Sequence, residues 1–106
     1  MDVIAKAREL GAALQQDERY TKLMEAQKAN EADTALNELI AKIQLVKMSF
    51  QHEAAKEDNN EQKLEAYDKD FGEIYTQIMA NPNMQAYEAA RGEIDKLMQY
   101  INSIFA

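Results

Sequence analysis

Three stretches of the chain, residues 36–50, 64–78 and 87–104, carry apolar side chains at alternating spacings of three and four residues. An α-helix completes a turn in about 3.6 residues, so each set falls on one helix face, as in helices that pair side by side. The side chains predicted to form this core seam are Leu36, Ile43, Phe50, Leu64, Phe71, Ile78, Ile94, Leu97 and Ile101. We expect Ile94 and Leu97, in the middle of the last stretch, to be fully buried.

Residues that break helices are scarce in this chain. One proline and three glycines occur in 106 residues, and no stretch alternates apolar with polar residues as a half-buried strand does. A chain of this length is also too short for two independent cores. We therefore predict an all-α fold with a single helical domain over residues 1–106. The expected helices cover residues 2–15, 17–30, 33–57, 60–80 and 82–105.

Two polar segments predict how the last three helices are connected. The run 56–61 contains turn-type residues, and either Asp58 or Asn59 could cap the helix that follows. At Asn81-Pro82, asparagine is a common N-cap, and proline suits the first helical position because the N–H that it lacks would have had no partner. The seams before and after the 56–61 turn should therefore pair as a long antiparallel hairpin.

The N-terminal third predicts additional, shorter helices. Asp17 suits a helix N-cap or a kink, although the second helix could instead simply extend the first. Either Asn30 or Asp33 can begin the next helix, since both side chains accept hydrogen bonds from free backbone N–H groups. Local pattern leaves both choices open.

The charge balance is acidic. With 19 acidic against 12 basic residues, the formal net charge is -7, and such a field repels phosphate backbones. Direct nucleic-acid binding is therefore not expected. The alternative is a nucleic-acid-associated helical protein with a local basic surface, on which basic residues such as Lys42, Lys47, Arg91 and Lys96 would gather.

Residues that carry chemistry are few. The chain has no cysteine, which excludes disulfides, thiolate metal sites and cysteine nucleophiles. A bundle di-iron site needs Glu-x-x-His pairs, but Ser49 stands three positions before His52, the single histidine. No phosphate-binding loop or nucleophile elbow occurs. We predict no catalytic, cofactor-binding or metal-binding residues and no enzymatic activity; a carboxylate site hidden from sequence pattern is the remaining enzymatic alternative.

A second apolar stripe lies roughly opposite the core seam on the expected helix 33–57. It consists of Ala41, Leu45 and Met48, with His52 in line. Two interpretations are open. The N-terminal helices of the same chain could cover the stripe, or it could be the contact with another subunit or partner.

The N-terminus, Met1 to Lys6, lacks a basic segment followed by an apolar run, and no segment approaches about 18 consecutive apolar residues. We therefore expect a cytoplasmic protein that does not cross a membrane. A long, thin helical hairpin exposes more apolar stripe than a short chain can cover, so we also expect a homo-oligomer, a dimer or larger.

Several short motifs resemble those of the YlbF/YmcA family of small bacterial helical proteins. Near the N-terminus, Glu9-Leu10-Gly11 with Leu14 precedes Asp17-Glu18-Arg19-Tyr20, which leads to Glu25-Ala26. The C-terminal part is more similar still. There the family-like motif is Asn81-Pro82 with Tyr87 and Ala90, followed by the Ile94, Leu97 and Ile101 helix. The likeness covers nearly the whole chain.

This resemblance implies a helical protein with a long antiparallel hairpin, found as homo- or hetero-oligomers in the cytoplasm of Gram-positive bacteria. The best-known members are non-enzymatic regulators of competence, sporulation and biofilm formation, and their complex with a third protein assists the ribonuclease that matures messenger RNA. Some members hold iron–sulfur clusters through cysteines, which this chain lacks, so the cluster function does not carry over. The expectation is an oligomeric, non-catalytic adaptor that also forms hetero-complexes with related family proteins.

Overall fold

The computed structural model describes residues 2–106 and contains five helices in this range. They are α1 (Val3–Gln16), α2 (Glu18–Ala32), α3 (Thr34–Ala54), α4 (Glu61–Ala80) and α5 (Pro82–Phe105). No strand occurs among the described residues, which confirms the predicted all-α fold class. The third helix ends at Ala54, three residues earlier than expected.

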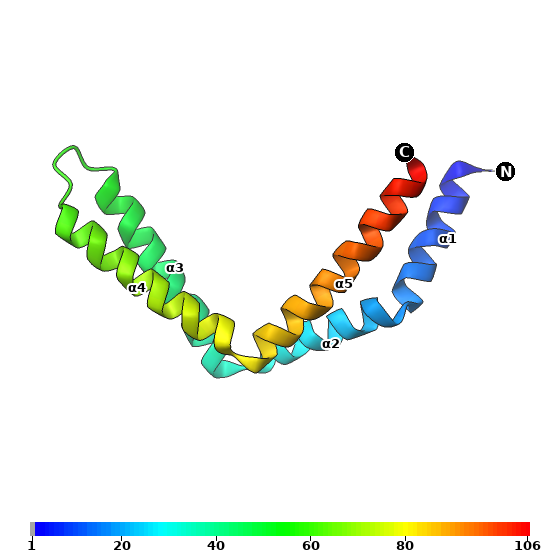
Figure 1. The fold of residues 1–106 in the computed structure, drawn as a ribbon, viewed down its shortest axis with the longest axis horizontal. Helices are drawn as coiled ribbons and strands as arrows, with labels where there is room; N and C mark the ends of the chain where they lie inside the picture. Colours follow the sequence, from blue (N-terminus) through cyan, green and yellow to red (C-terminus); the bar gives the residue numbers. More distant parts are fainter. Residues whose placement is uncertain (1) are drawn as a thin grey trace.

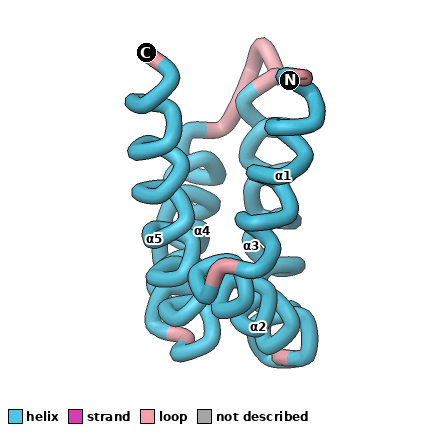
Figure 2. The backbone as a smooth tube through the Cα atoms, turned by 90° about the vertical axis from the view of Figure 1, so that its right-hand side faces the viewer, coloured by secondary structure: helices cyan, strands magenta, loops and turns pink. Residues whose placement is uncertain are grey.

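The helices form two arms that meet in a V (Figure 1). One arm is the antiparallel hairpin of α3 and α4, as the two seams predicted. In the other arm α2 pairs with α5, and α1 continues from α2 toward the end at which both termini lie. Seen from the side, α1 and α5 lie in front and the hairpin lies behind them (Figure 2).

The molecule is elongated and thin. Its extents are 63 × 31 × 18 Å, and its radius of gyration is 19.8 Å. A compact domain of this length would have a radius of gyration of about 13 Å. The accessible surface is 8209 Å², whereas a compact monomer of this mass exposes about 6,000 Å². The chain therefore leaves about 2,200 Å² more surface in solvent than a compact fold would.

Few side chains of this chain are buried. Among the apolar side chains of the described residues, Leu36 (0% exposed) and Ile78 (6%) alone are buried. Full burial of Ile94 and Leu97 was expected, but both are half-buried. The reason is that each helix of an arm packs mainly on one neighbour, and one neighbour covers only part of the circumference of a helix.

Short polar side chains begin each helix. Asp17 ends α1 and caps α2 by accepting from the Arg19 N–H at 2.8 Å, so the second helix does not extend the first. Asp33, and not Asn30, caps α3. At the hairpin turn the cap is Asn60, whose Oδ1 accepts from the N–H groups of residues 62 and 63, and not Asp58 or Asn59.

Candidate interaction surfaces

The vertex of the V is a network of hydrogen bonds that joins both breaks between the arms. Asp33 Oδ1 accepts from the Leu36 N–H at 3.0 Å and so caps α3. Its other oxygen, Oδ2, accepts from Asn81 Nδ2 at 3.0 Å and from Asn83 Nδ2 at 2.9 Å. Asn81 in turn caps α5 through its Oδ1, which accepts from the Asn83 and Met84 N–H groups. The two caps are thus bonded to each other.

The vertex network favours the charged form of Asp33. The Leu36 N–H contributes most, followed by the side-chain amides of Asn81 and Asn83, and together they hold the pKa of the Asp33 carboxyl below its ordinary value of 3.8. Asp33 and Asn81 are both half-buried. A charged carboxylate at a helix N-terminus also interacts favourably with the helix dipole.

Two further side chains bridge the breaks at the vertex. Asn37 of α3 donates through Nδ2 to the carbonyl oxygen of Glu31 at the end of α2, at 3.0 Å. Gln85 of α5 donates through Nε2 to the carbonyl oxygen of Met79 at the end of α4, at 3.1 Å. Each break is therefore held by a side chain of the helix that follows it.

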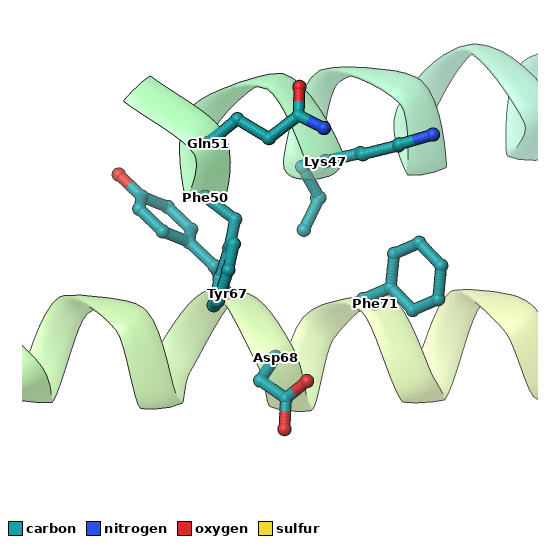
Figure 3. A pocket seen from close by; sticks show the side chains of 7 residues that line it. Lys47, Phe50, Gln51, Tyr67, Asp68 and Phe71 are labelled. Carbon is teal, nitrogen blue, oxygen red and sulfur yellow. The ribbon is translucent and has the colours of Figure 1, made fainter. Parts of the chain in front are cut away.

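A groove lies between α3 and α4 in the half of the hairpin nearer its turn; we call it the hairpin groove. Its volume is about 350 Å³, and it is lined by Val46, Lys47, Phe50, Gln51, Tyr67, Asp68 and Phe71. Figure 3 shows Phe50 pointing from α3 toward α4 beside Tyr67, with Phe71 further along α4. Most of the lining is therefore apolar and aromatic.

The aromatic side chains of the hairpin groove remain partly in solvent. Phe50 and Phe71, both predicted for the core seam, are each 37% exposed. Tyr75, which is 52% exposed, stacks on Phe71 with a ring-centroid distance of 6.4 Å. Tyr67 is half-buried. The hairpin seam thus ends in an aromatic surface that neither α3 nor α4 covers.

The other members of the predicted core seam lie along the interiors of the two arms. Ile43 and Leu64 are half-buried in the hairpin, and Ile101 is half-buried on α5. Leu36 and Ile78, the two buried members, lie next to the vertex, where α3 begins and α4 ends. Burial of the apolar seam is therefore deepest at the vertex, where the two arms meet.

The predicted second stripe on α3 is uncovered. Ala41, Leu45, Met48 and His52 are all exposed, with Leu45 at 63% and Met48 at 64%. The interpretation that the N-terminal helices cover it is wrong, because α2 packs on α5 in the other arm. Leu45 lies about 140° around α3 from Phe50, so this outer stripe and the hairpin groove face different directions.

A buried carboxylate lies at the tip of the hairpin and was not identified from the sequence. Glu53, near the end of α3, is 5% exposed. Its two oxygens lie 3.5 Å from Lys56 Nζ and 3.8 Å from Lys63 Nζ. Lys63 belongs to α4, so the carboxylate links both sides of the turn. The one signal for this ion pair in the sequence was the placement of Lys56 and Lys63 on either side of the turn.

The basic residues of the nucleic-acid alternative do not gather on one surface. Lys42 and Lys47 are on α3, whereas Arg91 and Lys96 are on α5 in the other arm. Arg91 also pairs with Glu88 at 3.0 Å, and Lys96 pairs with Glu93 at 3.6 Å. The geometry therefore does not favour a local basic surface.

Within residues 2–106, no three His, Asp or Glu side chains gather in a way that could hold a metal ion. None of the described helices is both long enough and apolar enough to cross a membrane.

The family-like motif lies where α4 passes into α5. Asn81 caps α5 and Pro82 takes its first position, as predicted. Tyr87 and Ala90 are half-buried on the part of α5 that follows, and Ala90 lines a groove with Ala26 of α2. A family model described as "Control of competence regulator ComK, YlbF/YmcA" matches residues 3–106.

The chain belongs to the YlbF/YmcA family. The match spans the whole V, so the vertex, the hairpin and the N-terminal helices all lie within the family region. A search of curated proteins and a search of solved structures each found no match. Membership in the YlbF/YmcA family relates the chain to regulators that control competence.

Proposed function

We propose that this protein is a non-catalytic adaptor or regulator of the YlbF/YmcA type that acts as an oligomer in the cytoplasm. The observation that carries the proposal is the uncovered apolar surface. Helices α1 and α5 contain no buried residue, although both have a distinct apolar face. Exposed contiguous apolar surface in a protein of this size is typical of a site for another chain.

The total accessible surface, which exceeds that of a compact monomer, supports the same proposal. The excess over a compact monomer is about 2,200 Å² per chain, or about 4,400 Å² for two chains. Standard complexes bury about 1,600 Å² in total, and obligate homodimers bury about 2,000–5,000 Å². The excess therefore has the size of an obligate subunit interface.

The outer stripe is our candidate for contact with a second kind of partner, such as a related family protein. Leu45 and Met48 present flexible, exposed apolar side chains on a helix, a form that suits helix-in-groove recognition. His52 continues this surface toward the hairpin tip. The regulatory description of the family supports a role through protein contacts of this kind.

The test is an affinity purification of the tagged protein from its native cell, followed by mass spectrometry. We expect the wild-type protein to retain a related helical protein, and we expect Leu45→Glu to lose it because a charge would be placed in the contact. Gln99→Ala on α5 is the matched control and should retain the partner. Nuclease treatment that releases all retained protein would support the nucleic-acid alternative and contradict the proposal.

A further inference from the structure

We propose that the hairpin groove is the contact between two copies of this chain, which pair hairpin to hairpin about a two-fold axis. The inference rests on the proposed oligomeric function and names both the surface and its occupant. In the resulting dimer, α3 and α4 of each copy form one layer of a four-helix bundle. The aromatic side chains that one hairpin leaves in solvent are then covered by the other.

The incomplete burial of the hairpin seam carries the first step. Ile43 and Leu64 are half-buried, and Phe50 and Phe71 are 37% exposed, although all four belong to the seven-residue pattern of a packed core. Two helices alone cannot enclose such a seam. A second hairpin would supply the missing layer without any change in the fold of the first.

The charges beside the hairpin groove favour a second copy as the occupant. Lys47 lies on the α3 side and Asp68 on the α4 side, and both side chains are exposed. Neither forms an ion pair within residues 2–106. In an interface with two-fold symmetry, residue i of one copy meets residue j of the other and the reverse. Lys47 of each copy can therefore face Asp68 of the other.

The charges of the groove are themselves balanced, unlike those of the whole chain. The groove carries one positive and one negative side chain, so its charges select neither a strongly acidic nor a strongly basic partner. A second copy is the partner that satisfies both charges at once. The outer stripe faces away from the groove, so dimer formation leaves Leu45 and Met48 free for the partner proposed above.

The first experiment compares two exposed apolar side chains of the hairpin. Sedimentation equilibrium at micromolar concentration should give about twice the chain mass of 12.1 kDa for the wild type. Phe71→Glu, inside the groove, should give the single-chain mass, while Leu45→Glu on the outer stripe should remain dimeric. Circular dichroism should show wild-type helix content for both variants.

The second experiment reverses the charges and does not depend on the packing of the aromatic side chains. Lys47→Glu and Asp68→Lys should each raise the dimer dissociation constant at least about tenfold, because each places like charges together twice. The double variant should recover wild-type affinity. Both positions are exposed in the single chain, so a purely structural role would not produce recovery.

The outcomes separate this inference from the proposed function. A dimeric wild type whose mass is unchanged by Phe71→Glu, or a double charge reversal that does not recover affinity, overturns the groove as the contact and leaves oligomeric action standing. Dimer loss in Leu45→Glu with retention in Phe71→Glu would move the contact to the outer stripe. A wild type that sediments only at 12.1 kDa overturns the groove inference and the oligomeric part of the function together.

Discussion

Asp33 and Asn81, 48 positions apart in the chain, are bonded through their side chains at the vertex, where Asn81 Nδ2 donates to Asp33 Oδ2 at 3.0 Å. Each residue also caps the helix that follows it. One carboxylate therefore both begins α3 and holds the start of α5 against it. We therefore expect the angle between the arms to depend on this carboxylate, because each arm continues directly from one of the two caps.

The first prediction concerns Asp33→Asn, which replaces the hydrogen-bond acceptor Oδ2 of Asp33 with a donor. In Asp33→Asn, Oδ1 can still accept from the Leu36 N–H, but the second oxygen becomes an NH₂ group that faces the amide donors of Asn81 and Asn83. We expect α3 to keep its cap and the angle between the arms to become variable. Spin labels on cysteines introduced at Glu65 and Gln99, one on each arm, should show a broader distance distribution.

The control for this measurement is Asp2→Asn. Asp2 caps α1 by accepting from the Ile4 N–H at 3.0 Å, and its side chain makes no bond to another helix. The chain has no cysteine of its own, so spin labels attach only at the two introduced cysteines. Labelled protein is diluted in unlabelled protein to suppress distances between copies. An unchanged distribution in Asp33→Asn would show that packing, and not the carboxylate, sets the angle.

The second prediction concerns acid stability. The pKa of Asp33 is held below 3.8 in the folded state, mainly by the Leu36 N–H and then by the two asparagine amides. The carboxylate therefore stabilises the fold above about pH 4 and loses this effect as the pH falls through its folded pKa. Urea unfolding of wild type and Asp33→Asn should differ at about pH 6, and the difference should shrink as the pH falls below 3.8 and passes through the lower folded pKa.

The titration of the Asp17 carboxyl does not disturb this comparison. Its pKa is also lowered, first by the Arg19 N–H and then by the Arg19 side chain, but it lies at the break between α1 and α2. Both proteins in the comparison retain Asp17, so its titration cancels in the difference. A constant difference between wild type and Asp33→Asn across the whole pH range would contradict the assigned role of the Asp33 charge.

Local pattern was sufficient to predict the helices but not the arrangement of the arms. Asn81-Pro82 marked the start of α5 because cap and proline preferences act within a few residues. Periodicity, in contrast, tells which face of a helix is apolar and not which helix will cover it. The pairing of α5 with α2, and the V that follows from it, therefore lay beyond the sequence.

The same limit explains why the candidate surfaces were only partly anticipated. Phe50 and Phe71 were assigned to the core because seam spacing predicts burial in whatever assembly the helix enters, including an assembly of several chains. Asp33 was a candidate cap, but its bonds to Asn81 and Asn83 join residues about 50 positions apart. Such bonds depend on tertiary arrangement, and no short motif encodes them.

The third prediction compares three side chains of different burial. Leu36 is fully buried, so Leu36→Ala should lower the free energy of unfolding by about 2–5 kcal/mol. Leu97 is half-buried, and Leu97→Ala should cost roughly 1–2 kcal/mol. The exposed Gln99 is the control, with a cost under about 0.5 kcal/mol on replacement by alanine. Urea midpoints at one fixed protein concentration give the comparison.

Equal midpoints for Leu97→Ala and Gln99→Ala would show that the apolar face of α5 is assigned wrongly. A cost for Leu97→Ala as large as that for Leu36→Ala would have a different meaning. Another chain would then cover α5 in solution and complete the burial that the single chain lacks. Repeating the measurement at a tenfold lower protein concentration would distinguish that case, because only an intermolecular contribution changes.

The last prediction concerns the buried Glu53 at the hairpin tip, with Lys56 and Lys63 within 4 Å of its two oxygens. A buried charge left without its partners is costly, whereas replacing the whole group by an apolar one of similar volume is often neutral. Glu53→Leu should therefore change the free energy of unfolding by less than about 1 kcal/mol. The double variant Lys56→Met and Lys63→Met should be the less stable protein, since it retains the carboxylate alone. If Glu53→Leu proved the more damaging change in urea unfolding, the ion pairs would contribute more than their exposed lysines suggest.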